Sequence, residues 1–135
     1  GHELGHGGLD AYLEANPARV REAHAWVHLG ASIGTSHNPL VQAYMSDETL
    51  RKSARRMIHS RFRADRFTWH AEGQHGSGEA RNIAQRGGRF FSLAGLSDWF
   101  HLECDRWPEA VDVDWLSGIT GAIAALVGDL AGSVE

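Results

Sequence analysis

The sequence predicts an α/β fold in which helices cover a mixed β-sheet as a sandwich. Along the chain, segments with the alternating polarity of strands are followed by segments with the periodicity of helices. The length of 135 residues suits a single hydrophobic core. A hydrophobic content of 42% and a charged content of 22% are ordinary for a globular domain. One domain without internal repeats is therefore expected.

Two helices and one strand are expected in the first half of the chain. Apolar residues recur at helical spacing over residues 9–15, and the pair Asn16-Pro17 ends that helix. Residues 23–29 alternate in polarity and include β-forming residues, which predicts a buried strand. Ser46 is expected to cap a second helix that runs to about residue 59.

The second half is expected to add strands and two further helices. Residues 61–70 alternate weakly and are interpreted as a strand. Residues 79–85 are expected to be helical, because a glycine pair follows them. Residues 89–93 are expected to be a strand, followed by a loop that carries His101. Residues 113–127 place apolar side chains on one face, which predicts a long final helix.

Charge and hydropathy argue against two classes of partner. The net charge of −4 and the pI of about 6.1 give no electrostatic footprint for nucleic acid. Basic residues do gather over residues 51–66, where a solvated helix face and loop are expected. No uninterrupted apolar run reaches about 18 residues, so no membrane span is expected. The single cysteine excludes a disulfide framework within the chain.

The first nine residues carry the clearest functional pattern. His2-Glu3-x-x-His6 matches the short zinc-protease motif, in which two histidines one helical turn apart bind zinc and the glutamate activates water. However, glycines occupy positions 5, 7 and 8, and each costs a helix interior roughly 1 kcal/mol relative to alanine. We therefore expect that His2 and His6 do not chelate one ion from a helix. The helical zinc protease remains a minor hypothesis.

Three segments together resemble the two-zinc exopeptidases typified by bacterial leucyl aminopeptidase and glutamate carboxypeptidase. Residues 1–9, Gly-His-Glu-Leu-Gly-His-Gly-Gly-Leu, resemble the segment E-E-x-G-L-x-G-S of that family. Residues 100–112, which begin Phe-His-Leu-Glu-Cys-Asp, resemble (Y/I)-H-T-x-x-D-T-x-x-x-x-D, whose histidine binds metal. Residues 78–87 have the spacing of S-D-H-x-x-F-x-x-x-G. The segments occur in the family's order, and only residues 35–75 align with nothing specific.

This resemblance implies a fold, a reaction and a set of site residues. Residues 1–135 would be the C-terminal part of one zinc-exopeptidase-like domain, incomplete at its N-terminus, because the family's first histidine and bridging aspartate ligands precede the glutamate segment. The reaction would be hydrolysis of a peptide or small amide, in the manner of an aminopeptidase-like exopeptidase, with one or two zinc ions. Glu3 and His101 would bind metal, His2 would occupy the position of the general base, and the carboxylate of Asp105 would orient an imidazole.

The chain also departs from the pattern of the family. His2 replaces the general-base glutamate, and an imidazole that titrates near neutrality could still accept a proton from metal-bound water. Gly30 falls where the family has an aspartate ligand, so His28 would have to substitute from two residues away. Glu79 and Ala80 stand where aspartate and histidine are usual. These changes leave open a catalytically silent relative that binds a ligand or partner in the cleft.

Overall fold

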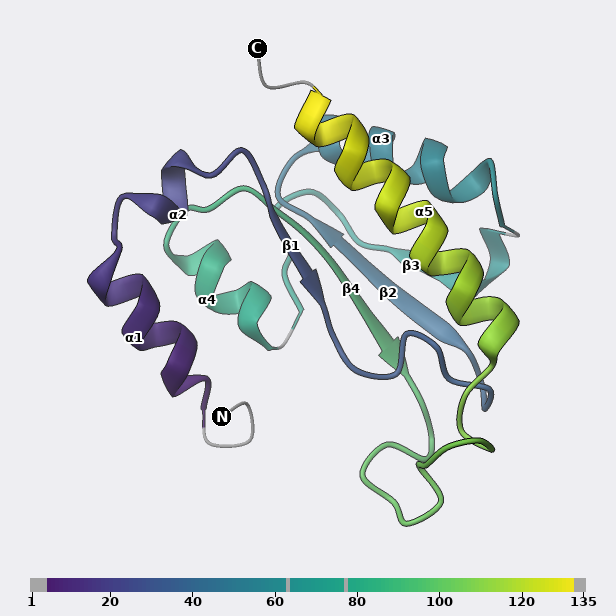
Figure 1. Ribbon diagram of the computed structural model, residues 1–135. Coiled ribbons are helices and arrows are strands. Elements are labelled where there is room, and N and C mark those ends of the chain that lie inside the picture. Colours follow the sequence, from purple (N-terminus) through teal and green to yellow (C-terminus); the bar gives the residue numbers. More distant parts are fainter. Residues whose placement is uncertain (1–4, 63, 77, 133–135) are drawn as a thin grey trace.

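The computed structural model of the chain describes residues 5–62, 64–76 and 78–132 (Figure 1). It is an α/β structure with one four-stranded mixed sheet in the order β1-β4-β2-β3. Strands β1 and β4 are parallel, β2 and β3 are parallel, and β2 runs antiparallel to β4. The predicted α/β class with a mixed sheet is confirmed. The strands are β1 (Trp26–Leu29), β2 (Leu40–Met45), β3 (Phe67–Trp69) and β4 (Phe90–Leu96).

Helices cover both faces of this sheet (Figure 1). On one face α3 and α5 pack against each other, and α3 contacts β2. On the opposite face α4 contacts β1 and β4, and α1 packs on α4. A short 3₁₀ turn, η2 (Ala64–Arg66), leads into β3. The helices are α1 (Gly7–Ala15), α2 (Arg19–Glu22), α3 (Glu48–His59), α4 (Glu79–Gln85) and α5 (Val113–Gly132).

Strand alternation divides the apolar side chains between two cores of unequal size. Phe91 and Leu93 of β4 belong to the larger core, whereas Phe90, one residue earlier, belongs to the smaller one. The smaller core lies under α1, α2 and α4, and its buried members among the described residues are Leu13, Val20, Ile83 and Phe90. The larger core lies under α3 and α5 and contains Val41, Ala43, Met45, Leu50, Ala54, Ile58, Phe67, Phe91, Leu93, Trp115, Ile119, Ala122, Ile123 and Leu126.

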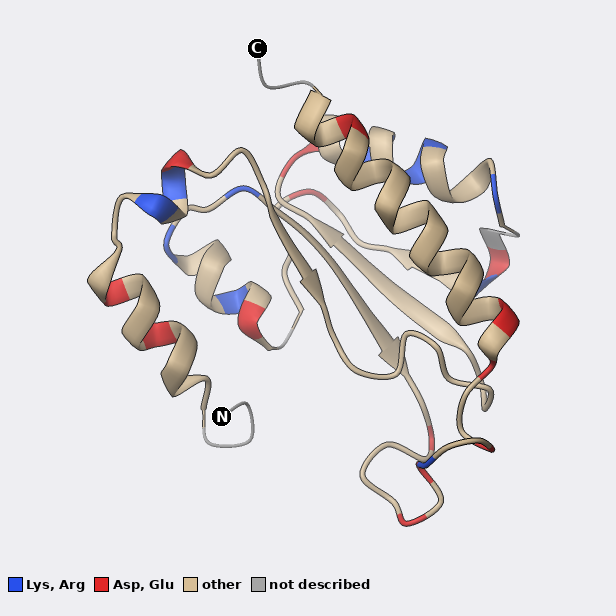
Figure 2. Cartoon of the chain, in the orientation of Figure 1, with Lys and Arg blue, Asp and Glu red and all other residues tan. Residues whose placement is uncertain are grey.

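The helix α5 combines a buried face with a long apolar composition. Among the described residues it is the one helix long and apolar enough to cross a membrane by length and composition, with 20 residues and a mean hydropathy of 1.4. Figure 2 shows it without basic residues, with acidic residues near each end. Ile119, Ala122 and Leu126 of this helix are fully buried against the sheet and α3. Burial in the larger core involves 28% of the apolar window of this helix.

Most predicted elements are present, with shifted boundaries. The predicted helix over residues 79–85 coincides with α4, and the final helix extends further, to Gly132. The strand predicted over residues 23–29 contains only Trp26–Leu29, and within residues 61–70 only Phe67–Trp69 form a strand. On α3, Lys52, Arg55 and Arg56 are solvent-exposed, as expected, whereas Arg51 is partly buried.

The cap of α3 differs from the prediction by one residue. Asp47, and not Ser46, is the N-cap, and its Oδ1 accepts a hydrogen bond from the backbone N–H of Leu50 at 2.8 Å. Ser46 supports this cap, because its hydroxyl donates to Asp47 Oδ2 at 3.0 Å. Carboxylate is the stronger acceptor for an exposed backbone N–H group, which favours Asp47 at this position.

Candidate functional site

A cleft of about 650 Å³ opens on the α4 side of the sheet, beyond the area covered by the smaller core. It lies beside the carboxyl ends of β1 and β4, the place where α/β sheets commonly bind ligands. Strand residues form its floor, and its walls come from the start of α1, the segment leading into α4 and the loop after β4. The lining residues used below are Gly5, His6, His28, Gly30, Ser92 and Phe100.

Close backbone packing fixes one end of the cleft floor. A Cβ atom on Gly95 would lie only 1.9 Å from the carbonyl oxygen of Ser32, so no larger residue fits there. The N–H of Gly95 donates to Ala31 O at 2.8 Å, and the N–H of Gly30 donates to Leu93 O at 2.7 Å. These contacts extend the pairing of β1 and β4 beyond the strands themselves and hold the floor in place.

His28 and Ser92, two polar residues of the cleft lining, contact each other, and Glu79 at the start of α4 contacts His28. His28 on β1 pairs in register with Ser92 on β4, and His28 Nδ1 lies 2.8 Å from Ser92 Oγ. The other ring nitrogen, Nε2, lies 3.3 Å from Oε2 of Glu79 at the start of α4. An ionised carboxylate only accepts hydrogen bonds, so beside it Nε2 carries the proton and Nδ1 accepts from the Ser92 hydroxyl. Ser92 is only 1% exposed.

A second polar network fixes His6 at the rim. His6 Nδ1 lies 3.0 Å from Oδ1 of Asn82, whose amide donates to Asp10 at 2.7 Å. Arg86 also donates to Asp10, at 2.9 Å. The Asn82 hydrogen bond, together with the charge of Arg86, lowers the pKa of the Asp10 carboxyl below its ordinary value. This network ties the beginning of α1 to α4.

The described part of the His2–His6 motif is not α-helical. Gly5 has a φ of 86° and His6 a φ of 63°, both in the left-handed region, and α1 begins only at Gly7. His6 is therefore the N-cap of α1 and not part of a helix interior. The expectation that the motif is not one continuous helix is confirmed at these two positions. His2 and Glu3 lie outside the described residues.

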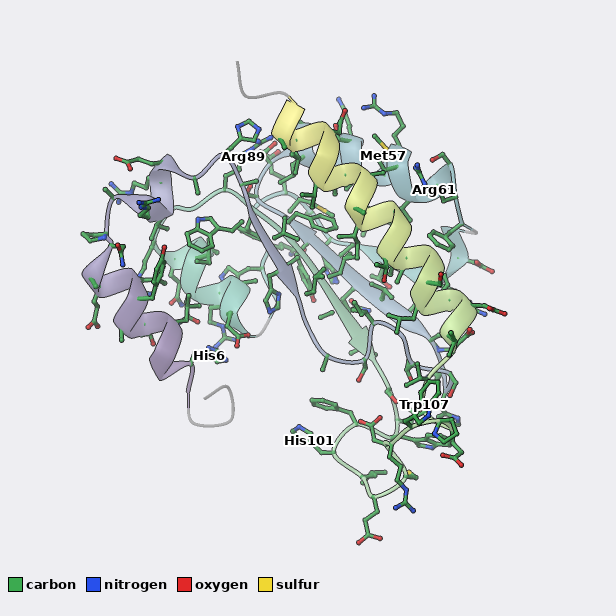
Figure 3. All side chains as sticks on the ribbon, in the orientation of Figure 1. His6, Met57, Arg61, Arg89, His101 and Trp107 are labelled. Carbon is green, nitrogen blue, oxygen red and sulfur yellow. The ribbon has the colours of Figure 1, made fainter. Side chains whose placement is uncertain are left out.

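His101, the second predicted metal ligand, lies on the exposed loop after β4. Its ring stacks on Phe100, with centroids 3.9 Å apart, and Phe100 lines the cleft. Gly5 and His6, which follow the Glu3 segment directly, line the same cleft. Figure 3 shows His6 and His101 at the end of the sheet where β1 and β4 finish. The predicted approach of Glu3 to His101 stays a prediction, because Glu3 lies outside the described residues.

Asp105, predicted to orient an imidazole, lies on the same loop as His101. It is exposed, and its N–H donates to the carbonyl oxygen of Leu102 at 3.0 Å. Asp105 borders a smaller pocket of about 250 Å³, which Phe100 and Leu116 also line. The contact between Asp105 and an imidazole stays a prediction.

Sequence reasoning missed Ser92 as a member of this site. The only signal is a single polar residue inside the apolar run Phe90-Phe91-Ser92-Leu93. Gln42 and Tyr44 were missed for another reason, since the strand that carries them was not predicted. The contact between His28 and Ser92 can be identified only when the register between β1 and β4 is known.

The described residues do not contain a complete metal site. Within residues 5–62, 64–76 and 78–132, no group of three or more His, Cys, Asp or Glu side chains is arranged to hold an ion. Comparison of the chain with models of protein families, with curated proteins and with solved structures found no match. The resemblance to zinc exopeptidases therefore rests on the sequence segments alone.

Proposed function

We propose that the chain contributes the metal- and substrate-binding cleft of a zinc-dependent hydrolase that cleaves a peptide or small amide, in the manner of an aminopeptidase-like exopeptidase. One observation carries the proposal. Gly5 and His6, next to the Glu3 segment, and Phe100, next to His101, line a single cleft at the carboxyl ends of β1 and β4. Segments from opposite ends of the sequence thus reach one concave site, as active sites on α/β sheets require.

The residues of this chain have distinct roles in the proposal. Glu3 and His101 supply carboxylate and imidazole ligands, an ordinary donor pair for zinc. Zinc held there would supply a bound water of lowered pKa. His2 takes up the proton of that water, because an imidazole titrates near neutral pH. The Phe100 ring, 44% exposed, offers an apolar surface for a substrate side chain.

The test measures zinc content and turnover of amino-acyl amides and dipeptides on the full chain. Glu3→Ala and His101→Ala are expected to lose zinc, because each removes a ligand. His2→Gln is expected to keep zinc but lose about 100- to 10,000-fold in kcat, the usual cost of losing a general base. His24→Gln is the matched control, since His24 is exposed and does not line the cleft. Full activity in His2→Gln would refute the base assignment.

A silent ligand-binding protein is the second candidate. It is favoured by Gly30, which has no side chain to bind metal where the resemblance places an aspartate, and by the lack of a three-ligand group within the described residues. Zinc content and turnover of the unmodified chain decide between the hydrolase and the silent ligand-binding protein. An unmodified protein without zinc and without turnover that still binds a dipeptide saturably in calorimetry would support the silent candidate and end the hydrolase proposal.

A further inference from the structure

We infer that Ser92, His28 and Glu79 act as a nucleophile, a general base and a positioning carboxylate for metal-independent transfer of a small acyl group to water. The three side chains come from β4, from β1 and from the first turn of α4. All three belong to the part of the chain that the structure describes, so the inference requires neither Glu3 nor a metal ion. It goes beyond the proposed function, which assigns no role to Ser92.

The order of the hydrogen bonds is the first argument. His28 Nδ1 lies 2.8 Å from Ser92 Oγ, and His28 Nε2 lies 3.3 Å from Glu79 Oε2. The Glu79 carboxylate accepts the Nε2 proton, which leaves the Nδ1 lone pair to accept the proton of the Ser92 hydroxyl. A hydroxyl that donates to an imidazole, which is itself oriented by a third group, is the arrangement that activates a serine nucleophile. Either ring nitrogen can act as the base, provided that the other one carries the proton.

The surroundings of Ser92 are the second argument. Ser92 is 1% exposed, but it lines the cleft together with His28. On the same face of the sheet, the next positions toward the carboxyl ends of the strands are Gly30, just after β1, and Ala94 on β4. Both also line the cleft, and neither has side-chain atoms beyond Cβ that would cover the Ser92 hydroxyl. Because the hydroxyl is so little exposed, an acyl group that reaches it must be small.

The remaining cleft lining indicates the class of substrate. Leu96 and Phe100, 50% and 44% exposed, add apolar surface to the same cleft. A carboxylic ester with a short acyl group fits this arrangement, with its apolar alcohol or phenol against Leu96 and Phe100. The side chains of His28 and Glu79 are 15% and 34% exposed, so the carboxylate lies where it stabilises the positive charge that His28 gains during the reaction.

The reaction balances in two steps. First, Ser92 Oγ forms a bond to the acyl carbon while its proton moves to His28 Nδ1. The C–O bond of the ester then breaks, and the departing oxygen takes that proton. Next, a water molecule gives a proton to Nδ1 while its oxygen bonds to the acyl carbon, and Ser92 Oγ leaves and recovers the proton. Glu79 holds the imidazole through Nε2–H in both steps.

The experiment measures covalent labelling of the full chain by a small alkyl fluorophosphonate and turnover of p-nitrophenyl acetate, both in the presence of EDTA. The unmodified chain is expected to form an adduct that peptide mass spectrometry places on Ser92. Ser92→Ala is expected to lose this adduct. His28→Gln is expected to lower the labelling rate and kcat by about 100- to 10,000-fold, the usual cost of losing a general base. Glu79→Asp, which keeps a carboxylate, is expected to retain more activity than Glu79→Gln.

Controls and outcomes keep this inference separate from the proposed function. Ser117→Ala and His24→Gln change exposed residues outside the cleft lining and should be labelled like the unmodified chain. Circular dichroism of each variant shows that it is folded. An unmodified chain without an adduct on Ser92 overturns the inference, whether or not the chain binds zinc. Equal labelling rates in folded His28→Gln and the unmodified chain also overturn it. An adduct on Ser92 with EDTA-resistant turnover supports it, even where the zinc measurements end the proposed function.

Discussion

Asp47 shows how one carboxylate joins three parts of the fold. It caps α3 through the N–H of Leu50, accepts from Ser46, and pairs with Arg89 at 2.8 Å, just before β4. Burial tends to raise the pKa of Asp47, but the hydrogen bonds from Arg89, Leu50 and Ser46 outweigh burial and lower it below the ordinary value. The ionised form therefore contributes to the stability of the folded chain.

This shift predicts a pH-dependent difference between Asp47→Asn and the unmodified chain. The folded pKa lies below the unfolded value of about 3.9. The stabilisation is thus complete above about pH 5 and is lost as the pH falls through the folded pKa. At pH 7 we expect Asp47→Asn to unfold more easily by up to about 1 kcal/mol, because the partly exposed Arg89 pair is screened by solvent. Urea unfolding at pH 7 and pH 3 should show the difference shrinking on acidification; a constant difference would contradict the assignment.

At the scale of elements, local sequence signals are enough to predict some helices, whereas the strand β2 depends on its tertiary context. The helices α1 and α4 could be predicted because capping glycines, a proline and apolar periodicity act within a few residues. The strand β2 could not, because Leu40, Val41, Ala43, Tyr44 and Met45 are all apolar or aromatic and show no clear alternation. Its identity follows from its neighbours, since β2 lies between β4 and β3. Its burial does alternate, with Val41, Ala43 and Met45 buried, but the partly exposed face also carries apolar or aromatic residues, so the composition hides the period.

The end of β4 gives a prediction about two glycine substitutions. In Gly95→Ala the new Cβ would lie 1.9 Å from Ser32 O and 2.1 Å from Ser32 C, so backbone must move. We expect a loss of at least about 2 kcal/mol in the free energy of unfolding, as for other overpacked sites. Gly121→Ala on α5 is the matched control, because a Cβ there meets nothing within 4 Å. It should stabilise the helix by about 0.5–1 kcal/mol. Equal effects in denaturant unfolding would show that the Ser32 contact does not constrain this strand.

At the scale of the whole molecule, the unequal cores determine where a ligand can bind. The larger core fills one face of the sheet, whereas the smaller core, around Phe90, leaves the other part of its face to the cleft. The segments chosen from local motifs continue into residues that line this cleft, Gly5 and His6 on one side and Phe100 on the other, whereas the roles of Glu3 and His101 stay predictions. Sequence reasoning could not find the floor, since the contact of His28 with Ser92 depends on strand register.

The same layering predicts that α5 stabilises the entire molecule, including the cleft on the opposite face. Ile119 is 0% exposed in the larger core, so Ile119→Ala should cost about 2–5 kcal/mol. Val127→Ala, on the same helix but 42% exposed, is the control and should cost much less. Because both cores share β4, we expect one cooperative transition for Ile119→Ala, with far-UV and near-UV circular dichroism changing together. A near-native unfolding free energy in Ile119→Ala, or separate transitions for the two signals, would show that α5 is not an integral layer of this fold.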